Sequence, residues 1–123
     1  MRDEEHKIQS GIIKAVEPIP ECRWLHANPN GGYRSVVTGA RLKAEGVKRG
    51  IPDLFLPVPR PKINNYMEWY CGFYIEVKTP TGRQTKDQKE FEKFAVEQGY
   101  KYAIVRSTQE GVDEILGYLG ISR

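Results

Sequence analysis

The sequence has no long apolar run, which excludes a helical membrane protein. None of its 123 residues fall in a stretch approaching the roughly 18 consecutive apolar residues of a membrane span. The N-terminal segment 1–10 is also too acidic and polar for a secretory signal peptide. We therefore expect the protein to act in the cytoplasm.

Cysteine is scarce as well. The two cysteines, Cys22 and Cys71, lie far apart and form no C-x-x-C pair, which excludes the common zinc motifs built on such pairs. In a reducing cytoplasm both are expected to be free thiols, and a disulfide between them is the less favoured alternative.

A strong net charge is also missing, since the formal charge is only +3. With 39% hydrophobic and 28% charged residues, the composition is typical of a globular protein, and the length predicts a single domain over 1–123. The charge is uneven, because residues 1–21 carry a net −2 and residues 22–50 a net +5. The second segment is either a phosphate-facing surface or a solvated basic face. Its basic residues include Arg34, Arg41, Lys43, Lys48 and Arg49.

Hydrophobic spacing predicts an α/β protein with one mixed sheet flanked by helices. Segment 34–45 is ambiguous, because residues 41–45 favour a helix whereas 36–38 are β-prone. The strands on either side of a proline-rich insertion at 57–72 are expected to form a hairpin. The other predicted elements are helices over 3–16, 87–98 and about 108–119, and strands over 22–27, 53–56, 73–77 and 102–105.

Three polar residues on the paired strands are the candidate catalytic centre. Side chains alternate along a strand, so Glu76 and Lys78 point the same way, whereas Val77 points into the core. Asp53 directly follows Pro52, whose fixed φ bends the incoming chain so that this carboxylate projects toward Glu76. Two carboxylates and one lysine are therefore expected to converge.

Two neighbouring carboxylates repel each other, and a hard divalent cation with oxygen ligands relieves this repulsion. Mg²⁺ is the expected ion, with Mn²⁺ as a substitute. Such a site suits phosphodiester hydrolysis, because the cation orients the phosphate and offsets the charge of the transition state. Lys78 either binds the scissile phosphate or positions and deprotonates the attacking water, and the sequence leaves both roles open.

The order of these motifs along the chain resembles the PD-(D/E)XK nucleases. Within that superfamily the sequence is similar to the virus-type replication-repair nuclease (VRR-NUC) domain from Glu5 to about Ser107. The likeness rests on four parts of the sequence. They are Glu5-His6-Lys7-Ile8-Gln9, Gly50-Ile51-Pro52-Asp53, Glu76-Val77-Lys78 and Gln88.

The resemblance implies a restriction-endonuclease-like fold and assigns roles to the motif residues. Asp53 and Glu76 would ligate the metal together with the backbone carbonyl of Val77, and Glu5 would support the site through a water. Lys78 would serve catalysis, and Gln88 would orient Lys78 or the substrate.

Several of these residues also have simpler interpretations. Glu5 belongs to an acidic first helical turn, which complements the helix dipole in any case. Gln88 on a polar helix face would otherwise be an ordinary solvated residue. Arg83 and Lys86 either meet backbone phosphates near a helix start or are merely solvated.

The insertion carries the aromatic residues Tyr66, Trp69 and Tyr70, which either stack on unpaired bases or form an oligomer contact. We favour a homodimer, because stand-alone domains of this family resemble junction-resolving enzymes and symmetric cleavage needs two active sites. The expected substrate is therefore DNA, with a four-way junction or other branched form preferred, and the expected source is a phage or prophage. The alternatives are an endonuclease or nickase without branch preference and a noncatalytic DNA-binding subunit.

Overall fold

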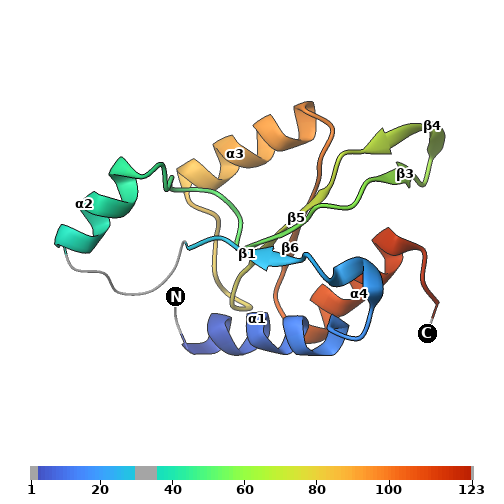
Figure 1. Cartoon of the computed structure of the whole chain (residues 1–123), viewed down its shortest axis with the longest axis horizontal. Helices are drawn as coiled ribbons and strands as arrows, with labels where there is room; N and C mark the ends of the chain where they lie inside the picture. Colours follow the sequence, from blue (N-terminus) through green and yellow to red (C-terminus); the bar gives the residue numbers. More distant parts are fainter. Residues whose placement is uncertain (1–2, 30–35, 123) are drawn as a thin grey trace.

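A four-stranded mixed sheet in the order β1-β2-β5-β6 forms the centre of the computed structural model, which describes residues 3–29 and 36–122 (Figure 1). Strands β1 and β2 are antiparallel, as are β2 and β5, whereas β5 and β6 are parallel. The expected mixed sheet and the hairpin of β2 with β5 are therefore confirmed. The strand bounds are β1 His26–Ala27, β2 Leu54–Leu56, β5 Phe73–Val77 and β6 Lys101–Val105.

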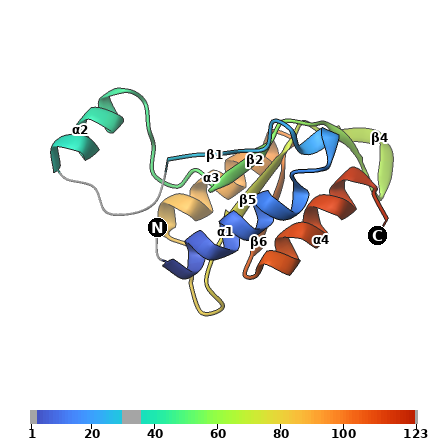
Figure 2. The same ribbon diagram turned by 60° about the horizontal axis from the view of Figure 1, so that its bottom comes forward.

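Helices cover both faces of this sheet (Figure 2). Helices α1 (Asp3–Val16) and α4 (Thr108–Leu119) pack on each other and on one face, and α3 (Lys86–Glu97) lies over the other. The close approach of α1 and α4 requires Gly111, because a Cβ there would overlap the side chain of Ile12. The main core lies between these two helices and the sheet, where the fully buried side chains include Ile12, Leu54, Leu56, Phe73, Ile75 and Ile115.

One expectation from the sequence was wrong, and one pair of strands was not predicted. Segment 22–27 is not one strand, because a 3-10 helix, η1 (Pro20–Cys22), and a turn precede the two-residue β1. The 57–72 insertion, to which the sequence assigned no strands, contains β3 (Arg60–Lys62) and β4 (Asn65–Tyr70), which form a separate two-stranded sheet. The prolines of this segment argue against strands, because proline cannot donate a ladder hydrogen bond. An edge position in a two-stranded ribbon nevertheless tolerates Pro61.

The ambiguous segment contains helix α2 (Val36–Ala44), which stands away from the sheet at the left of Figure 1. Its helical conformation overrides the β propensity of residues 36–38, whereas Arg34 lies outside the described residues. No helix within 3–29 and 36–122 is long and apolar enough to cross a membrane.

Candidate active site

The polar residues of the hairpin meet on the face of the sheet that α3 covers. Residue Leu54 pairs with Ile75, so continuing this register by one residue places Asp53 opposite Glu76. Directly opposed side chains project to the same face, and alternation places Lys78 there as well. Tyr74 lies on this face too, where its ring contacts Phe91 of α3 at a centroid distance of 5.0 Å. The expected convergence of Asp53, Glu76 and Lys78 is therefore present in the described structure.

Hydrogen bonds at the entrance of β2 fix Asp53. The Asn28 backbone N–H donates to the Asp53 carbonyl (2.9 Å), and the Asn28 amide donates to the carbonyl of Pro52 (2.8 Å). On the other side, the Val77 N–H donates to Asp53 Oδ2 over 2.7 Å. Asp53 Oδ2 therefore takes the place of a backbone carbonyl as the acceptor for the Val77 N–H. The other oxygen of this carboxylate is Oδ1.

The same exchange affects the Val77 carbonyl. Continuing the antiparallel register by two residues places Pro52 opposite Val77. Proline has no N–H, so Pro52 cannot donate a ladder hydrogen bond to that carbonyl. The sequence Pro52-Asp53 thus places the Val77 carbonyl oxygen next to the two carboxylates, without a ladder hydrogen bond from Pro52.

Glu76 is fully buried, and its two carboxylate oxygens have different surroundings. Oε1 accepts a hydrogen bond from the Tyr102 hydroxyl and a longer one from Gln84 Nε2 (3.4 Å). Oε2 is buried without a hydrogen-bond partner in the described structure, and the Lys78 ammonium lies 4.0 Å from it. Burying a charged oxygen without a partner is costly, so this atom is suited to a cation that completes the site.

Lys78 is itself nearly buried, with 9% of its surface exposed. Its Cδ lies 3.5 Å from the position of a Cβ at Gly82, so its stem packs along the turn that follows β5. Arg106 stabilises this turn, because its guanidinium donates to the carbonyls of Thr79 (2.8 Å) and Gly82 (2.7 Å). The ammonium is therefore held at the open end of the strand, beside Glu76.

The carboxylates influence one another electrostatically. The pKa of Asp53 is raised from 3.8 to about 6, mainly by burial and also by the negative charges of Glu5 and Glu76, against the opposing effects of the Val77 N–H and Lys78. Glu5 of α1 is thus close enough to act on Asp53, although no hydrogen bond joins them among the described contacts. A carboxylate that is costly to ionise gains from a bound cation.

These residues fit a divalent cation in three respects. The site offers Glu76 Oε2, which has no hydrogen-bond partner in the described structure, an Asp53 carboxylate that is costly to ionise, and the Val77 carbonyl, which are all hard oxygen ligands. No group of three or more His, Cys, Asp or Glu side chains within the described ranges forms a ready-made metal cage. A magnesium site needs none, since Mg²⁺ is usually held by one or two carboxylates and keeps several waters.

Gln88 has a different set of contacts from the expected one. Its side-chain oxygen accepts from the Thr85 N–H (2.8 Å), and its own N–H donates to the Thr85 hydroxyl (3.2 Å). These reciprocal bonds form a capping box at the start of α3. The described contacts include none between Gln88 and Lys78.

The expected DNA-contacting residues are all exposed but do not form one cluster. Residue Gly50 packs against the backbone of Asp87, so the loop carrying Lys48 and Arg49 adjoins the N-terminal turn of α3. Lys86 belongs to that turn. Arg83 lies in the loop before α3, whereas Arg41 and Lys43 are on the outlying helix α2 (Figure 1).

Four residues that were not predicted support this site from distant positions in the sequence. Tyr102 and Gln84 bind Glu76, and Asn28 and Arg106 fix the chain around Asp53 and Lys78. A strand over 102–105 was expected, and the alternation of side chains along it is the signal that could have placed Tyr102 on one face of the sheet. The other three donate mainly to backbone carbonyls or lie in loops, where spacing carries no such signal.

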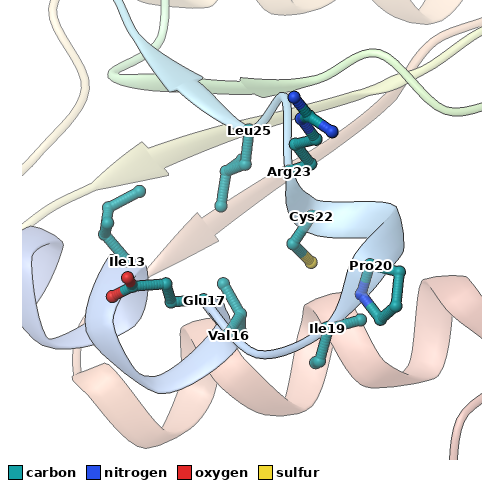
Figure 3. Close-up of a pocket in the computed structure, with 8 residues that line it drawn as sticks. All are labelled: Ile13, Val16, Glu17, Ile19, Pro20, Cys22, Arg23 and Leu25. Carbon is teal, nitrogen blue, oxygen red and sulfur yellow. The ribbon is translucent and has the colours of Figure 1, made fainter.

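Two hollows of the described structure lie away from the candidate site. One, of about 600 Å³, is formed by the end of α1, η1 and the following turn, and Figure 3 shows its lining, which includes Ile13, Cys22 and Leu25. A second, of about 480 Å³, lies beside the β3–β4 sheet and the end of α4. Neither is lined by Asp53, Glu76 or Lys78.

Comparison with known proteins agrees with this arrangement. The model of the VRR-NUC domain family matches residues 11–109, which include Asp53, Glu76, Lys78 and Gln88, whereas Glu5 precedes the match. A solved structure described as a VRR_NUC domain protein has a TM-score of 0.76 at 22% sequence identity, over 96% of this chain and 89% of that one. No curated protein matches the sequence. The chain therefore belongs to the VRR-NUC domain family, whose members are nucleases of the PD-(D/E)XK type.

Proposed function

We propose that this chain is a divalent-metal-dependent DNA endonuclease whose catalytic centre is formed by Asp53, Glu76 and Lys78. The observation that carries the proposal is the buried Glu76 Oε2, which has no hydrogen-bond partner in the described structure and lies opposite a second carboxylate. A noncatalytic DNA-binding protein would gain nothing from this costly arrangement. Members of a nuclease family can use it to hold a cation.

Mg²⁺ is the proposed cation, with Mn²⁺ as a substitute. Asp53, Glu76 Oε2 and the Val77 carbonyl would hold it, and Glu5 would support it through a water. When bound, the cation supplies positive charge that orients the phosphodiester and stabilises its transition state. The carboxylates face the same end of the strand as Lys78, so phosphate and cation would share one surface.

Lys78 is proposed to bind the scissile phosphate or to orient the attacking water. Its ammonium is nearly buried, and Coulombic attraction to a phosphate is stronger in such surroundings than in bulk water. Gln88 is proposed to act indirectly. Its capping box fixes the start of α3 and thereby the adjoining Gln84, which contacts Glu76.

The DNA backbone is proposed to approach along the loop of Lys48 and Arg49 and the start of α3. Exposed cations lie beside the N-terminal turn of α3 there, and cationic side chains and a helix start both favour phosphate. Arg83 and Lys86 would extend this surface, and Arg41 and Lys43 on α2 would reach DNA farther from the cut. The affinity for DNA should then fall steeply as the salt concentration rises.

Branched DNA and a homodimer are the finer parts of the proposal. The β3–β4 sheet exposes Tyr66 (74%), Met67 (92%) and Trp69 (55%), which would be unusual for a surface that stays in water. A second copy of the chain is the proposed partner of this sheet. Two sites related by a two-fold axis could then cut a four-way junction symmetrically.

The test is a cleavage assay with labelled four-way junction, flap, single-stranded and duplex DNA, in Mg²⁺, Mn²⁺ or EDTA. Glu76→Gln and Lys78→Met should each lower the cleavage rate by at least about 100-fold, since both remove charge used in the transition state. The matched controls are Glu114→Gln on α4 and Lys101→Met on β6, where these two residues pair with each other at 3.2 Å.

Paired symmetric cuts in the junction would support a dimeric resolvase, and equal cutting of all duplex forms would support an endonuclease or nickase without branch preference. DNA binding without cleavage in either metal would instead favour the noncatalytic subunit and overturn the proposal.

A further inference from the structure

The two oxygens of Glu76 are not equivalent, and the difference has a cause on the neighbouring strand. Oε1 is occupied by the Tyr102 hydroxyl and, over 3.4 Å, by Gln84 Nε2. Oε2 has no hydrogen-bond partner in the described structure and faces the Lys78 ammonium at 4.0 Å. The carboxylate is therefore anchored through one oxygen and presents the other to the site.

The anchor is rigid because three elements hold it. Tyr102 pairs with Tyr74 across β5 and β6, which sets its ring beside Glu76 on the same face of the sheet. Gln84 Nε2 lies 3.3 Å from the Tyr102 hydroxyl and donates to Glu92 of α3 over 2.9 Å. Rotation of the Glu76 carboxylate would break these contacts together, so its orientation is fixed before any ligand binds.

We propose that Tyr102, assisted by Gln84, restricts Glu76 to one-oxygen coordination and so selects small six-coordinate cations against Ca²⁺. This inference rests on the metal site proposed above. Calcium takes six to eight oxygen ligands and often binds both oxygens of one carboxylate, whereas Mg²⁺ requires a near-octahedral set. With Oε1 engaged by Tyr102, Glu76 cannot supply the second oxygen. Tyr102 is thus a positioning residue that touches neither metal nor DNA.

The test is metal affinity of the whole protein without DNA, which does not depend on catalysis. Bound Mn²⁺ is measured by electron paramagnetic resonance, and Ca²⁺ by its competition with Mn²⁺. Tyr102→Phe should weaken Mn²⁺ binding by about tenfold, the usual scale for losing a partner that orients a ligand. Its Ca²⁺ affinity should stay equal or rise, so the preference for Mn²⁺ over Ca²⁺ falls. Gln84→Leu should shift the preference in the same direction by a smaller factor, because its bond is longer.

The matched control is Tyr118→Phe, which also removes a buried tyrosine hydroxyl, here one that donates to the Val58 carbonyl over 2.5 Å. It should lower the melting temperature and leave both metal affinities unchanged. An unchanged Mn²⁺ to Ca²⁺ preference in Tyr102→Phe would overturn the inference alone and leave the nuclease proposal standing. Failure of the unaltered protein to bind either ion would overturn both, and an equal shift in Tyr118→Phe would reduce Tyr102 to a structural role.

Discussion

Strand β5 has two faces that differ in how their buried groups are satisfied. On the face toward α1 and α4, Phe73, Ile75 and Val77 are apolar and at most 1% exposed. On the face toward α3, Glu76 and Lys78 are almost equally buried but charged, and Glu76 Oε2 lacks a hydrogen-bond partner in the described structure.

Residues that stabilise the fold and residues proposed for function therefore lie on opposite faces of β5 and of its extension at Lys78, which directly follows it. Apolar burial stabilises the fold by roughly 25 cal/mol for each Å² removed from water. Buried charges oppose folding unless other groups compensate them, and like charges placed opposite each other in a sheet add to this cost. The strand therefore retains on one face a group of residues that only a ligand would fully satisfy, which is typical of a functional site.

The apolar face should carry the larger share of stability. Ile75→Ala should lower the free energy of unfolding by about 2 to 5 kcal/mol, because it removes buried methyl groups and leaves a cavity between β5 and the helices. Urea denaturation in EDTA measures this change. The variant should still bind Mn²⁺ at low temperature while it remains folded. A loss below about 1 kcal/mol would show that this face is not the main source of stability.

This division also explains how far the sequence predicted the site. Asp53, Glu76 and Lys78 were predicted because the signal is local, namely alternation along a strand and a proline before the carboxylate. Tyr102 lies 26 residues from Glu76, and Asn28 lies 24 residues from Pro52, so their contacts depend on strand order and register. Strand order cannot be obtained from the spacing of apolar residues alone.

The fold shows the same limit. The strongly periodic helices α1, α3 and α4 were predicted to within a few residues, because their apolar positions repeat at helical spacing. The β3–β4 sheet was missed because it has little apolar alternation, and its exposed residues pack against no core. Segment 22–27 was misassigned because six β-compatible residues can equally form a 3-10 turn and a two-residue edge strand.

The polar face should respond to pH in a way that the apolar face does not. The pKa of Asp53 is raised from 3.8 to about 6 in the folded protein. Between these two pH values the folded state keeps the Asp53 proton, whereas the unfolded state has released it. Its contribution to stability is complete below about pH 4 and is lost as the pH rises through about 6.

Asp53→Asn should therefore be more stable than the unaltered protein at pH 7.5 in EDTA, by between about 1 and 3 kcal/mol, and the difference should shrink toward pH 4.5. Paired urea titrations at the two pH values measure it. Saturating Mn²⁺ should reverse the order, because only the aspartate binds the cation well. A difference independent of pH would mean that Asp53 is not the group that makes this face costly.

The smallest expected effect concerns the helix that covers the polar face. Gln88→Ala removes one half of the capping box at the start of α3 and should lower the free energy of unfolding by about 1 kcal/mol. Thr85→Ala breaks the other half and should cost a similar amount, whereas Gln88→Glu keeps an acceptor oxygen and should cost less. If Gln88 acts on the site only by fixing α3, the alanine variants should lose cleavage activity to the same modest extent at a temperature where both remain folded. A loss in Gln88→Ala more than tenfold greater than in Thr85→Ala, about 1.4 kcal/mol in the activation free energy, would instead place Gln88 in direct contact with Lys78 or the substrate.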